Sequence, residues 1–397
     1  MPAETPSHVR PEQVVDFNFY RPCTPGGDPY LAWQRLQDGP EMIWTPHNGG
    51  HWIATRGEQI KEILTDYGRF SSRHAFIPII PERPRGLPLE YDPPEHAPLK
   101  KMLAPAFLPK AIQHWSDEAR ALAAELVEGF IDQGWCEFIE DFAQQLPIII
   151  FLRILDLPME DREPLLAAVN SGLRPVDEKT RKWGRDYLNN YIVELVAERR
   201  ENPREEILSA ALHTEINGKL LDDEMAYGLT SGLLGGGLDT VASSMGWMAL
   251  FLAENPGHRQ QLVDDPSLIP NAVQELLRRY SIPNIARVVR EDMDYHGAQL
   301  KQGEQVLMSG CLYGLDPNIF ENPMAVDFTR RDASRHMSYS TGIHRCIGAK
   351  LADQELQIFL QEWLPRIPDF RLDPDHPPEM VTGIAHGLNK LPLLWDA

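Results

Sequence analysis

The residue with the clearest chemical potential is Cys346, which lies in the segment 339–348 (YSTGIHRCIG). An amphipathic run follows directly and predicts a helix over about 347–365. Cys346 is therefore expected near a helix N-terminus, where free backbone N–H groups and the helix dipole favour a thiolate. Gly342 and Gly348 flank it and let a flat group approach closely. A thiolate in such a setting can ligate haem iron and favour O–O cleavage.

Spacing alone leaves other interpretations of this cysteine open. Most lone cysteines are small buried hydrophobes, and one beside a glycine turn is common. His344 suggests zinc, but no second ligand pair lies at a useful spacing. The chain has four cysteines, Cys23, Cys136, Cys311 and Cys346, and no C-x-x-C pair. A disulfide framework is therefore not expected, which agrees with a reducing cytoplasm.

A second group of residues is the run Gly235–Thr240 (GGGLDT), inside an apolar stretch that predicts one helix over 221–253. Three glycines in a helix cost about 1 kcal/mol each relative to alanine, so something large is expected against the backbone. Thr240 lies one turn after Gly236, whose carbonyl its hydroxyl can bond, loosening the helix. Asp239 needs a partner or a chemical role in apolar surroundings. A packing patch and a surface aspartate are the alternatives; without G-K-[ST], a phosphate loop is excluded.

Two pairs of charged residues stand at helical spacing. Glu275 and Arg278 are three apart, so one helix face can carry them as an ion pair. His96 and Lys100 are four apart, and cations there can neutralise a dianionic ligand. Each pair alone is weak evidence, because exposed ion pairs and solvated charged faces are common.

The elements that must position these residues are mostly helical from about residue 94 onward. Prolines forbid a long helix in 73–94, and a loop of this length is often a lid or binding loop. Asn48-Gly49 predicts a hairpin between Met42–Thr45 and His51–Thr55. Further β patterning covers 285–312, 369–372 and 388–395. Apolar spacing predicts helices over 58–65, 111–133, 137–153, 159–170, 178–200, 204–212, 221–253, 255–263, 270–280 and 347–365.

Composition narrows the classes of function. The 397 residues are 43% hydrophobic and 24% charged, enough to bury a large core. The formal charge of −20 repels phosphate backbones, so no nucleic-acid partner is expected. The N-terminus lacks the apolar region of a signal peptide, and no uninterrupted apolar run is long enough for a membrane span. We expect one helical core with a small β region, in the cytoplasm.

These groups of residues occur together in a familiar order. The chain resembles the cytochrome P450 superfamily along nearly its whole length and, within it, the bacterial camphor-hydroxylase family. The resemblance implies a mainly α fold of the cytochrome P450 type, a triangular helical body with a small β-rich region, as a single domain over 1–397. Its densest part is 226–396, with the motifs Gly-Gly-Leu-Asp239-Thr240, Glu275-Leu-Leu-Arg278-Arg279, Gly342-x-His344-x-Cys346-x-Gly348 and Arg366-Ile-Pro-Asp-Phe370.

The resemblance also implies roles at matched positions. Haem b is the implied cofactor, with Cys346 as the proximal iron ligand and Gly236 against the haem. Asp239 and Thr240 are implied as the proton-delivery pair, and Glu275 with Arg278 as a structural ion pair. The implied propionate partners are His96, Lys100, Arg287 and His344. The implied lining of the distal substrate pocket is Phe76, Gly232, Gly235, Pro283, Ile384 and Ala385.

The implied reaction inserts one atom of O₂ into a C–H bond of a small apolar molecule, here a terpenoid or norisoprenoid ring compound. Electrons must come from a separate carrier, since no Rossmann fingerprint is present. The resemblance implies a [2Fe–2S] ferredoxin and an NADH-dependent ferredoxin reductase. A peroxide-driven haem enzyme and a non-catalytic haem sensor are the rival interpretations. A local docking patch is expected at Arg73, Lys100, Lys101, Lys110 and Arg345.

The sequence departs from the family pattern at several positions. Tyr339 and Ser340 stand where Phe and Gly are usual, which affects the geometry of the cysteine loop. Lys100 replaces an arginine, so a bidentate propionate contact becomes a point contact. Gly232 replaces a leucine of the camphor enzymes, which opens space. Residues 79–90 contain no tyrosine to hold a ketone, so camphor is not the expected substrate.

Overall fold

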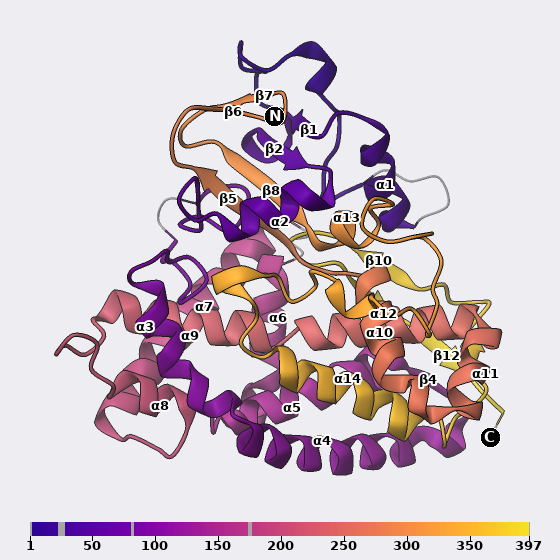
Figure 1. Cartoon of the computed structure of the whole chain (residues 1–397). Helices are drawn as coiled ribbons and strands as arrows, with labels where there is room; N and C mark the ends of the chain where they lie inside the picture. Colours follow the sequence, from indigo (N-terminus) through magenta and orange to yellow (C-terminus); the bar gives the residue numbers. More distant parts are fainter. Residues whose placement is uncertain (1, 23–27, 81–82, 174–176, 397) are drawn as a thin grey trace.

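The structure is a computed structural model that describes residues 2–22, 28–80, 83–173 and 177–396. The molecule has a triangular outline, with a broad helical base and a narrower apex (Figure 1). The apex contains N-terminal segments and the strands of residues 284–309, which are far apart in the sequence. This arrangement agrees with the mainly helical fold and small β-rich region expected from the sequence.

Helices make up most of the described chain. The predicted helices are present with ends shifted by a few residues, with two exceptions. The predicted helix 221–253 is broken in two. The segment 137–153 begins as the end of a strand, followed by a π-helical stretch, Ile139–Ala143. The short helices α1 and α13 were not predicted. The α-helices are α1 Pro29–Arg35, α2 Gly57–Thr65, α3 His96–Leu103, α4 Pro109–Phe130, α5 Gln145–Ile154, α6 Arg162–Leu173, α7 Glu178–Glu201, α8 Ile207–Leu212, α9 Asp223–Gly237, α10 Thr240–Glu254, α11 Pro256–Asp264, α12 Ile269–Arg279, α13 Gly310–Gly314 and α14 Ala349–Trp363.

Short strands form the β-rich region. The predicted hairpin is present, with Met42 opposite Ala54, and Asn48 and Gly49 both adopt positive φ in its turn. The five-stranded sheet has the order β1-β2-β8-β5-β3, from β1 Met42–Thr45, β2 His51–Ala54, β8 Gln305–Ser309, β5 Asn284–Val289 and β3 Phe70–Ser71. The smaller sheets contain β4 Trp135–Glu137, β6 Met293–Tyr295, β7 Ala298–Leu300, β9 Arg371–Leu372, β10 Glu379–Val381, β11 Gly387–Lys390 and β12 Pro392–Leu394.

The prediction of one continuous helix over 221–253 is wrong. Helix α9 ends at Gly237 and α10 begins at Thr240, with Asp239 outside helical geometry at φ −132° and ψ −29°. The Thr240 hydroxyl donates to the Gly236 carbonyl oxygen at 3.0 Å. At the break, the carbonyl of Gly236 thus accepts from a side-chain hydroxyl. The glycines that precede the break are weak helix formers, so both features favour an interruption here.

The core lies around α10 and α14. Every residue of α10 from Ala242 to Ala253 is buried, as expected for a helix surrounded by protein on all sides. Helix α14 packs against α4, α10 and α12 and buries an aromatic cluster around Trp363. Because α14 starts three residues after Cys346, this packing fixes the position of the cysteine loop.

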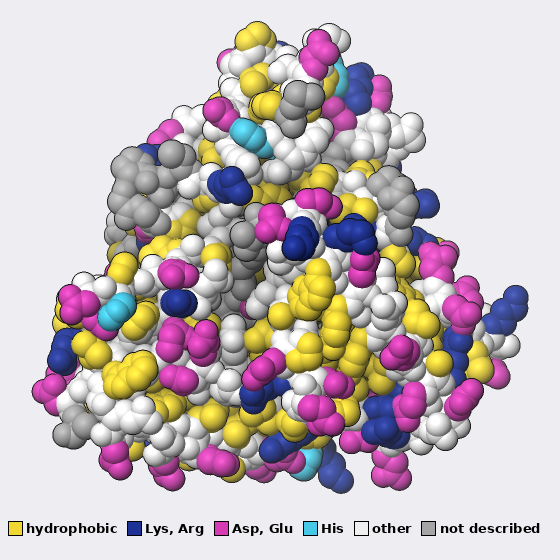
Figure 2. Space-filling view, turned by 180° about the vertical axis from the view of Figure 1, so that it is seen from behind, with side chains coloured by type: hydrophobic (Ala, Val, Ile, Leu, Met, Phe, Trp, Pro, Cys, Tyr) yellow, Lys and Arg dark blue, Asp and Glu magenta, His cyan; other side chains and the backbone are white. Residues whose placement is uncertain are grey.

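The surface agrees with the balance of charges in the sequence. On the face shown in Figure 2, acidic and basic side chains are interspersed over the surface. None of the described helices combines the length and the apolar character that crossing a membrane requires.

Candidate functional site

The cysteine loop, 339–348, is held by its own backbone and by one lysine. The Cys346 N–H donates to the Tyr339 carbonyl at 2.8 Å, which closes the loop ahead of α14. The Lys100 ammonium, from α3, donates to the carbonyl oxygens of Ile343 at 2.5 Å and Arg345 at 2.8 Å. Lys100 therefore braces the loop itself, a contact that the sequence did not predict.

Cys346 combines a buried thiol with a residue that is exposed as a whole. Burial raises the pKa of the Cys346 thiol, while the backbone N–H of Gly348 and the cations of Lys100 and Arg345 act in the opposite direction. The residue is nevertheless exposed, unlike the buried free cysteines Cys136 and Cys311. An exposed residue whose thiol lies deep in the protein borders an open space. Cys23 lies outside the described residues.

The two unusual residues at the start of the loop have structural explanations. Ser340 has φ 56°, in the left-handed region that favours glycine, which accounts for the glycine usual at this position. The Tyr339 hydroxyl donates to Asp353 Oδ1 at 2.8 Å. Burial raises the pKa of Tyr339, and the Asp353 carboxylate raises it further. The extra hydroxyl is thus accommodated by a partner on α14.

Two buried basic side chains beside the loop have polar atoms with nothing to bind. Among the described residues, Arg287 Nη2 and His96 Nε2 have no hydrogen-bond partner. Arg287 is 1% exposed, and burial lowers its pKa to about 10, partly offset by Asp92 and Glu90. Arg287 Nη1 donates to the Ala286 carbonyl oxygen at 2.9 Å, but a buried Nη2 that has no acceptor is costly. These two groups are therefore suited to an anionic ligand.

The remaining predicted propionate partner, His344, already has a partner. Its Nε2 lies 2.7 Å from the hydroxyl of Ser72, and its ring centroid lies 4.4 Å from that of His96. Burial lowers the pKa of His344 to about 2, and nearby cations lower it too. A pocket of about 390 Å³ lies between the region of α3 and the cysteine loop. It is lined by His96, Ala97, Lys100, Lys101, Ala104, Ile343 and Ile347.

A second pocket has no link to the predicted site. It measures about 450 Å³ and lies between the π-helical stretch, α5 and α6. None of the predicted site residues lines it. Its lining is Glu140, Asp141, Gln144, Gln145, Ile148, Arg162, Glu163 and Leu166.

The glycines of α9 divide into two kinds. A Cβ built on Gly235 or Gly236 would meet nothing within 4 Å, so this part of the backbone borders open space. A Cβ on Gly237 would stand 2.2 Å from the Phe151 ring, so Gly237 serves close packing. A Cβ on Gly232 would stand 2.3 Å from the Leu87 carbonyl oxygen. The space that Gly232 leaves is therefore occupied by the backbone of the 73–94 loop.

The acid–alcohol pair lies at the break between α9 and α10. Asp239 is 2% exposed, and its Oδ2 accepts from the Ser243 hydroxyl at 2.9 Å. Thr240 is bonded to Gly236 as described above. Ser243 was not singled out from the sequence, although its spacing of four from Asp239 was a usable signal.

The predicted substrate contacts come from separate segments. Pro283 and Ala385 form an isolated antiparallel bridge, and Asn284 N–H donates to the Ile384 carbonyl at 2.8 Å, which brings these segments together. Phe76 lies in the 73–94 loop, with the Arg83 guanidinium 5.1 Å above its ring centroid.

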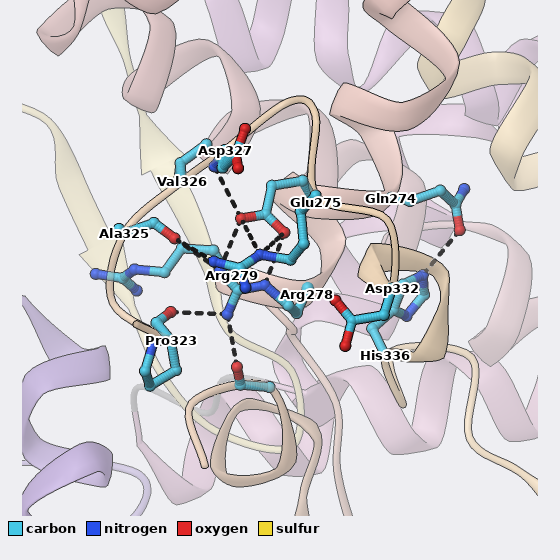
Figure 3. Close-up of polar contacts among 12 residues, drawn as sticks. Gln274, Glu275, Arg278, Arg279, Pro323, Ala325, Val326, Asp327, Asp332 and His336 are labelled. Atoms are coloured by element: carbon cyan, nitrogen blue, oxygen red, sulfur yellow. Dashed lines mark hydrogen bonds and ion pairs between the residues drawn. The ribbon is translucent and has the colours of Figure 1, made fainter. Parts of the chain in front are cut away.

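The Glu275–Arg278 pair is the centre of a buried network (Figure 3). Both side chains are fully buried, and Arg278 Nε and Nη2 donate to the two carboxylate oxygens at 2.7 and 2.8 Å. Arg330 Nε also donates to Glu275, at 3.0 Å. Arg278 further donates to the carbonyl oxygens of Gly314, Pro323 and Ala325. The network ties α12 to the irregular segment 315–345 that leads into the cysteine loop.

Comparisons with known proteins bear on the family and the fold of the chain. The family model described as cytochrome P450 matches residues 162–384. A probable cytochrome P450 127A1 from Sinorhizobium fredii is 32% identical, covering 98% of this chain and 96% of its own. The crystal structure of CYP101J2 superposes with a TM-score of 0.89 at 33% identity, covering both chains fully. That of CYP101C1 gives 0.88 at 35% identity, covering 99% of this chain and 100% of its own.

Proposed function

Because the chain belongs to the cytochrome P450 family, whose members are haem-dependent monooxygenases, we propose that it hydroxylates an apolar ring compound of the terpenoid or norisoprenoid type. The oxidant is O₂, and the electrons come from a [2Fe–2S] ferredoxin reduced by an NADH-dependent reductase in the cytoplasm. The observation that carries the proposal is the helix break, which sets Asp239 and Thr240 beside the open glycine face of α9.

The residues present fit haem b, the cofactor of the family. The open space at Gly235 and Gly236 and the exposure of Cys346 suit a large flat group, and the unpartnered atoms of Arg287 and His96 suit its carboxylates. Cys346 would ligate the iron. Bound haem supplies the activation of O₂.

The roles of the four basic residues then divide. Arg287 and His96 would receive the propionates, since their buried atoms have no partner among the described residues. Lys100 and His344 would mainly position the cysteine loop, because their nitrogens already contact Ile343, Arg345 and Ser72.

The roles proposed on the distal side follow from burial and hydrogen bonding. Asp239 is held by Ser243 inside the protein and would pass protons toward the open side of the break. The Thr240 hydroxyl gives its hydrogen to the Gly236 carbonyl, so on the open side of the break its oxygen would accept a hydrogen bond and help to hold a proton-carrying group there. The substrate would contact Phe76, Gly235, Pro283, Ile384 and Ala385, a mostly apolar set that suits a ring compound.

Thr240→Ala is expected to separate the monooxygenase from its rivals. O₂ and NADH consumption should continue while product per NADH falls at least about tenfold, because proton delivery at the break loses one of its two positioned side chains. Thr230→Ala is the matched control, because Thr230 makes the same hydrogen bond to the residue four before it, in α9. Product yield unchanged in Thr240→Ala would contradict the proposal; equal activity with hydrogen peroxide alone would favour the peroxide-driven alternative, and no turnover with either electron source would favour a sensor.

The electron-transfer partner is supported by charge. Arg73, Lys101, Lys110 and Arg345 make no ion pair within the part of the chain that the structure describes, and Lys101 lines the pocket beside the cysteine loop. Unpaired cations on an acidic protein suit an acidic carrier. Lys101→Glu with Arg345→Glu should slow reduction by ferredoxin at least about tenfold at low salt. Lys219→Glu, in the turn before α9, is the control, and an unchanged rate in the double variant would contradict this surface.

The substrate class is tested by binding spectra. Cyclic terpenoids and norisoprenoids should shift the Soret band of the purified holoprotein. Camphor should give an incomplete shift, because the described part of the loop holds no tyrosine before Tyr91, whose hydroxyl is taken up by Arg85 at 3.0 Å. A full shift with camphor would contradict this expectation.

A further inference from the structure

Glu90 is a fully buried carboxylate for which none of the roles above accounts. It is 0% exposed, and it pairs with the Arg83 guanidinium, whose Nη2 lies 2.5 and 2.7 Å from the two carboxylate oxygens. Its Oε1 also accepts from the Ala75 N–H at 3.0 Å, and its Oε2 from the Gly86 N–H at 2.8 Å. A charge buried this completely is stable only with such partners.

The partners of Glu90 lie on both limbs of the 73–94 loop. Ala75 is in the first limb, and its carbonyl oxygen accepts from the Ala286 N–H of β5 at 2.8 Å. Arg83 and Gly86 are in the returning limb. One carboxylate therefore joins the limb anchored on the sheet to the limb that returns toward α3.

The returning limb lies directly on α9. The Leu87 N–H donates to the Gly228 carbonyl oxygen at 3.0 Å. A Cβ on Gly228 would stand 2.2 Å from the Arg85 carbonyl oxygen, and one on Gly232 would stand 2.3 Å from that of Leu87. Backbone-to-backbone contact of this kind requires glycine on the helix. These contacts also place the returning limb on the part of α9 that directly precedes the open glycine face at Gly235.

We propose that Glu90 is a positioning residue that clasps the described limbs of this loop, residues 73–80 and 83–94, against α9 and thereby controls how molecules enter and leave the distal side. This inference rests on the proposed function, since it takes the glycine face of α9 as the side where substrate binds. Glu90 acts through the loop: with the clasp intact, Leu87 stays on Gly228 and Gly232, and the distal side is closed at this edge.

The contacts of Glu90 also affect two residues of the proposed site, Phe76 and Arg287. Arg83, held by Glu90, lies over the Phe76 ring and so fixes a proposed substrate contact. Glu90 and Asp92 both stabilise the charged form of Arg287, a proposed propionate partner. Opening the clasp is thus expected to disturb the loop and the substrate contact together.

The first test uses Glu90→Gln, which keeps the size of the side chain and removes its charge. In the haem-loaded protein, hydrogen exchange of the Leu87 amide should rise at least about tenfold, because loss of a buried charged hydrogen bond loosens the limb. The rates at which 4-phenylimidazole binds to and leaves the haem iron should rise at least about tenfold in stopped-flow spectra. Glu95→Gln, an exposed neighbour, should change neither rate. Glu90→Asp should restore part of the exchange protection.

The second test displaces the limb from the other side and leaves the ion pair intact. Gly232→Ala should push Leu87 away and reproduce the faster exchange and the faster azole kinetics. Gly129→Ala, where a Cβ meets nothing within 4 Å, is the control. This variant keeps the test decisive even when Glu90→Gln does not fold.

The outcomes separate this inference from the proposed function. Wild-type rates of exchange and azole binding in a haem-loaded Glu90→Gln or Gly232→Ala variant would overturn the clasp. Failure of terpenoids and norisoprenoids to shift the wild-type Soret band would count against the proposed substrate class and leave these rate differences as they are.

Discussion

At the scale of single residues, Arg287 presents the sharpest conflict within the protein alone. A guanidinium that is 1% exposed, with one nitrogen unpartnered among the described residues, destabilises the haem-free chain. A carboxylate beside it reverses that effect, since hydrogen bonds to charged groups contribute about 1.5–3 kcal/mol. The unsatisfied nitrogen therefore supports the proposed role of Arg287 as a propionate partner.

Arg287→Met is expected to act in opposite directions on the two forms. The free energy of unfolding of the haem-free protein should rise by about 1–3 kcal/mol, because a buried charge with an unsatisfied donor is removed. Haem loss from the holoprotein to a scavenger should accelerate at least about tenfold, because a propionate loses its charged donor. Urea titrations and Soret decay measure the two effects. Arg371→Met, on the exposed end of β9, should change neither; slower haem loss in Arg287→Met would contradict the role.

The residue scale also shows what sequence can and cannot provide. The cysteine loop was predictable because its motif is contiguous, and the glycine preference at position 340 is explained by the positive φ of Ser340. Glu90 and Ser72 were missed. Their partners, Ala75, Arg83 and His344, are defined by where the 73–94 loop folds and by long-range contact, which no local spacing encodes.

At the scale of elements, long amphipathic helices were predicted well because their apolar period extends over many residues. The break between α9 and α10 was missed although its cause, a hydroxyl that bonds the Gly236 carbonyl, was foreseen. The apolar pattern continues across Asp239 and hides the interruption. Strand β4 was missed for a different reason: its three residues are too short for a period, and pairing with β12 alone defines it.

Glu275→Gln tests how α12 holds the segment before the cysteine loop. The change leaves Arg278 buried with a weaker partner and also loosens Arg330 and Asp327, which bind the same carboxylate. The free energy of unfolding should fall by about 3–5 kcal/mol, and haem incorporation should fall with it.

The control for this prediction is another i,i+3 pair on a helix. Glu178→Gln removes the ion pair with Arg181 at 3.7 Å, in which Glu178 is 76% exposed. Screening by water limits its effect to about 0–1 kcal/mol. Equal effects of the two substitutions in urea titrations would show that burial of the network does not matter.

At the scale of the whole molecule, buried titratable groups set how stability depends on pH. His51 and His336 have pKa values lowered to about 4 and about 3, chiefly by burial. Between pH 6.5 and about 4 the unfolded chain gains protons that the folded chain does not, so stability falls on acidification. Glu355 on α14 acts oppositely, because burial raises its pKa to about 8.

Glu355→Gln isolates this second contribution. Below about pH 4.5 both states of the wild-type carry the proton, so the variant should match it in stability. As pH rises toward 8, the unfolded wild-type loses the proton while the folded protein retains it, and stability falls by about 1.4 kcal/mol per pH unit. The variant has no such loss and should be more stable than wild-type by about 4–5 kcal/mol at pH 8. Urea unfolding at pH 4.5, 6 and 8 measures the difference, with Glu95→Gln as the exposed control; a gap that stays constant across the three pH values would mean that Glu355 is ionised in the folded protein.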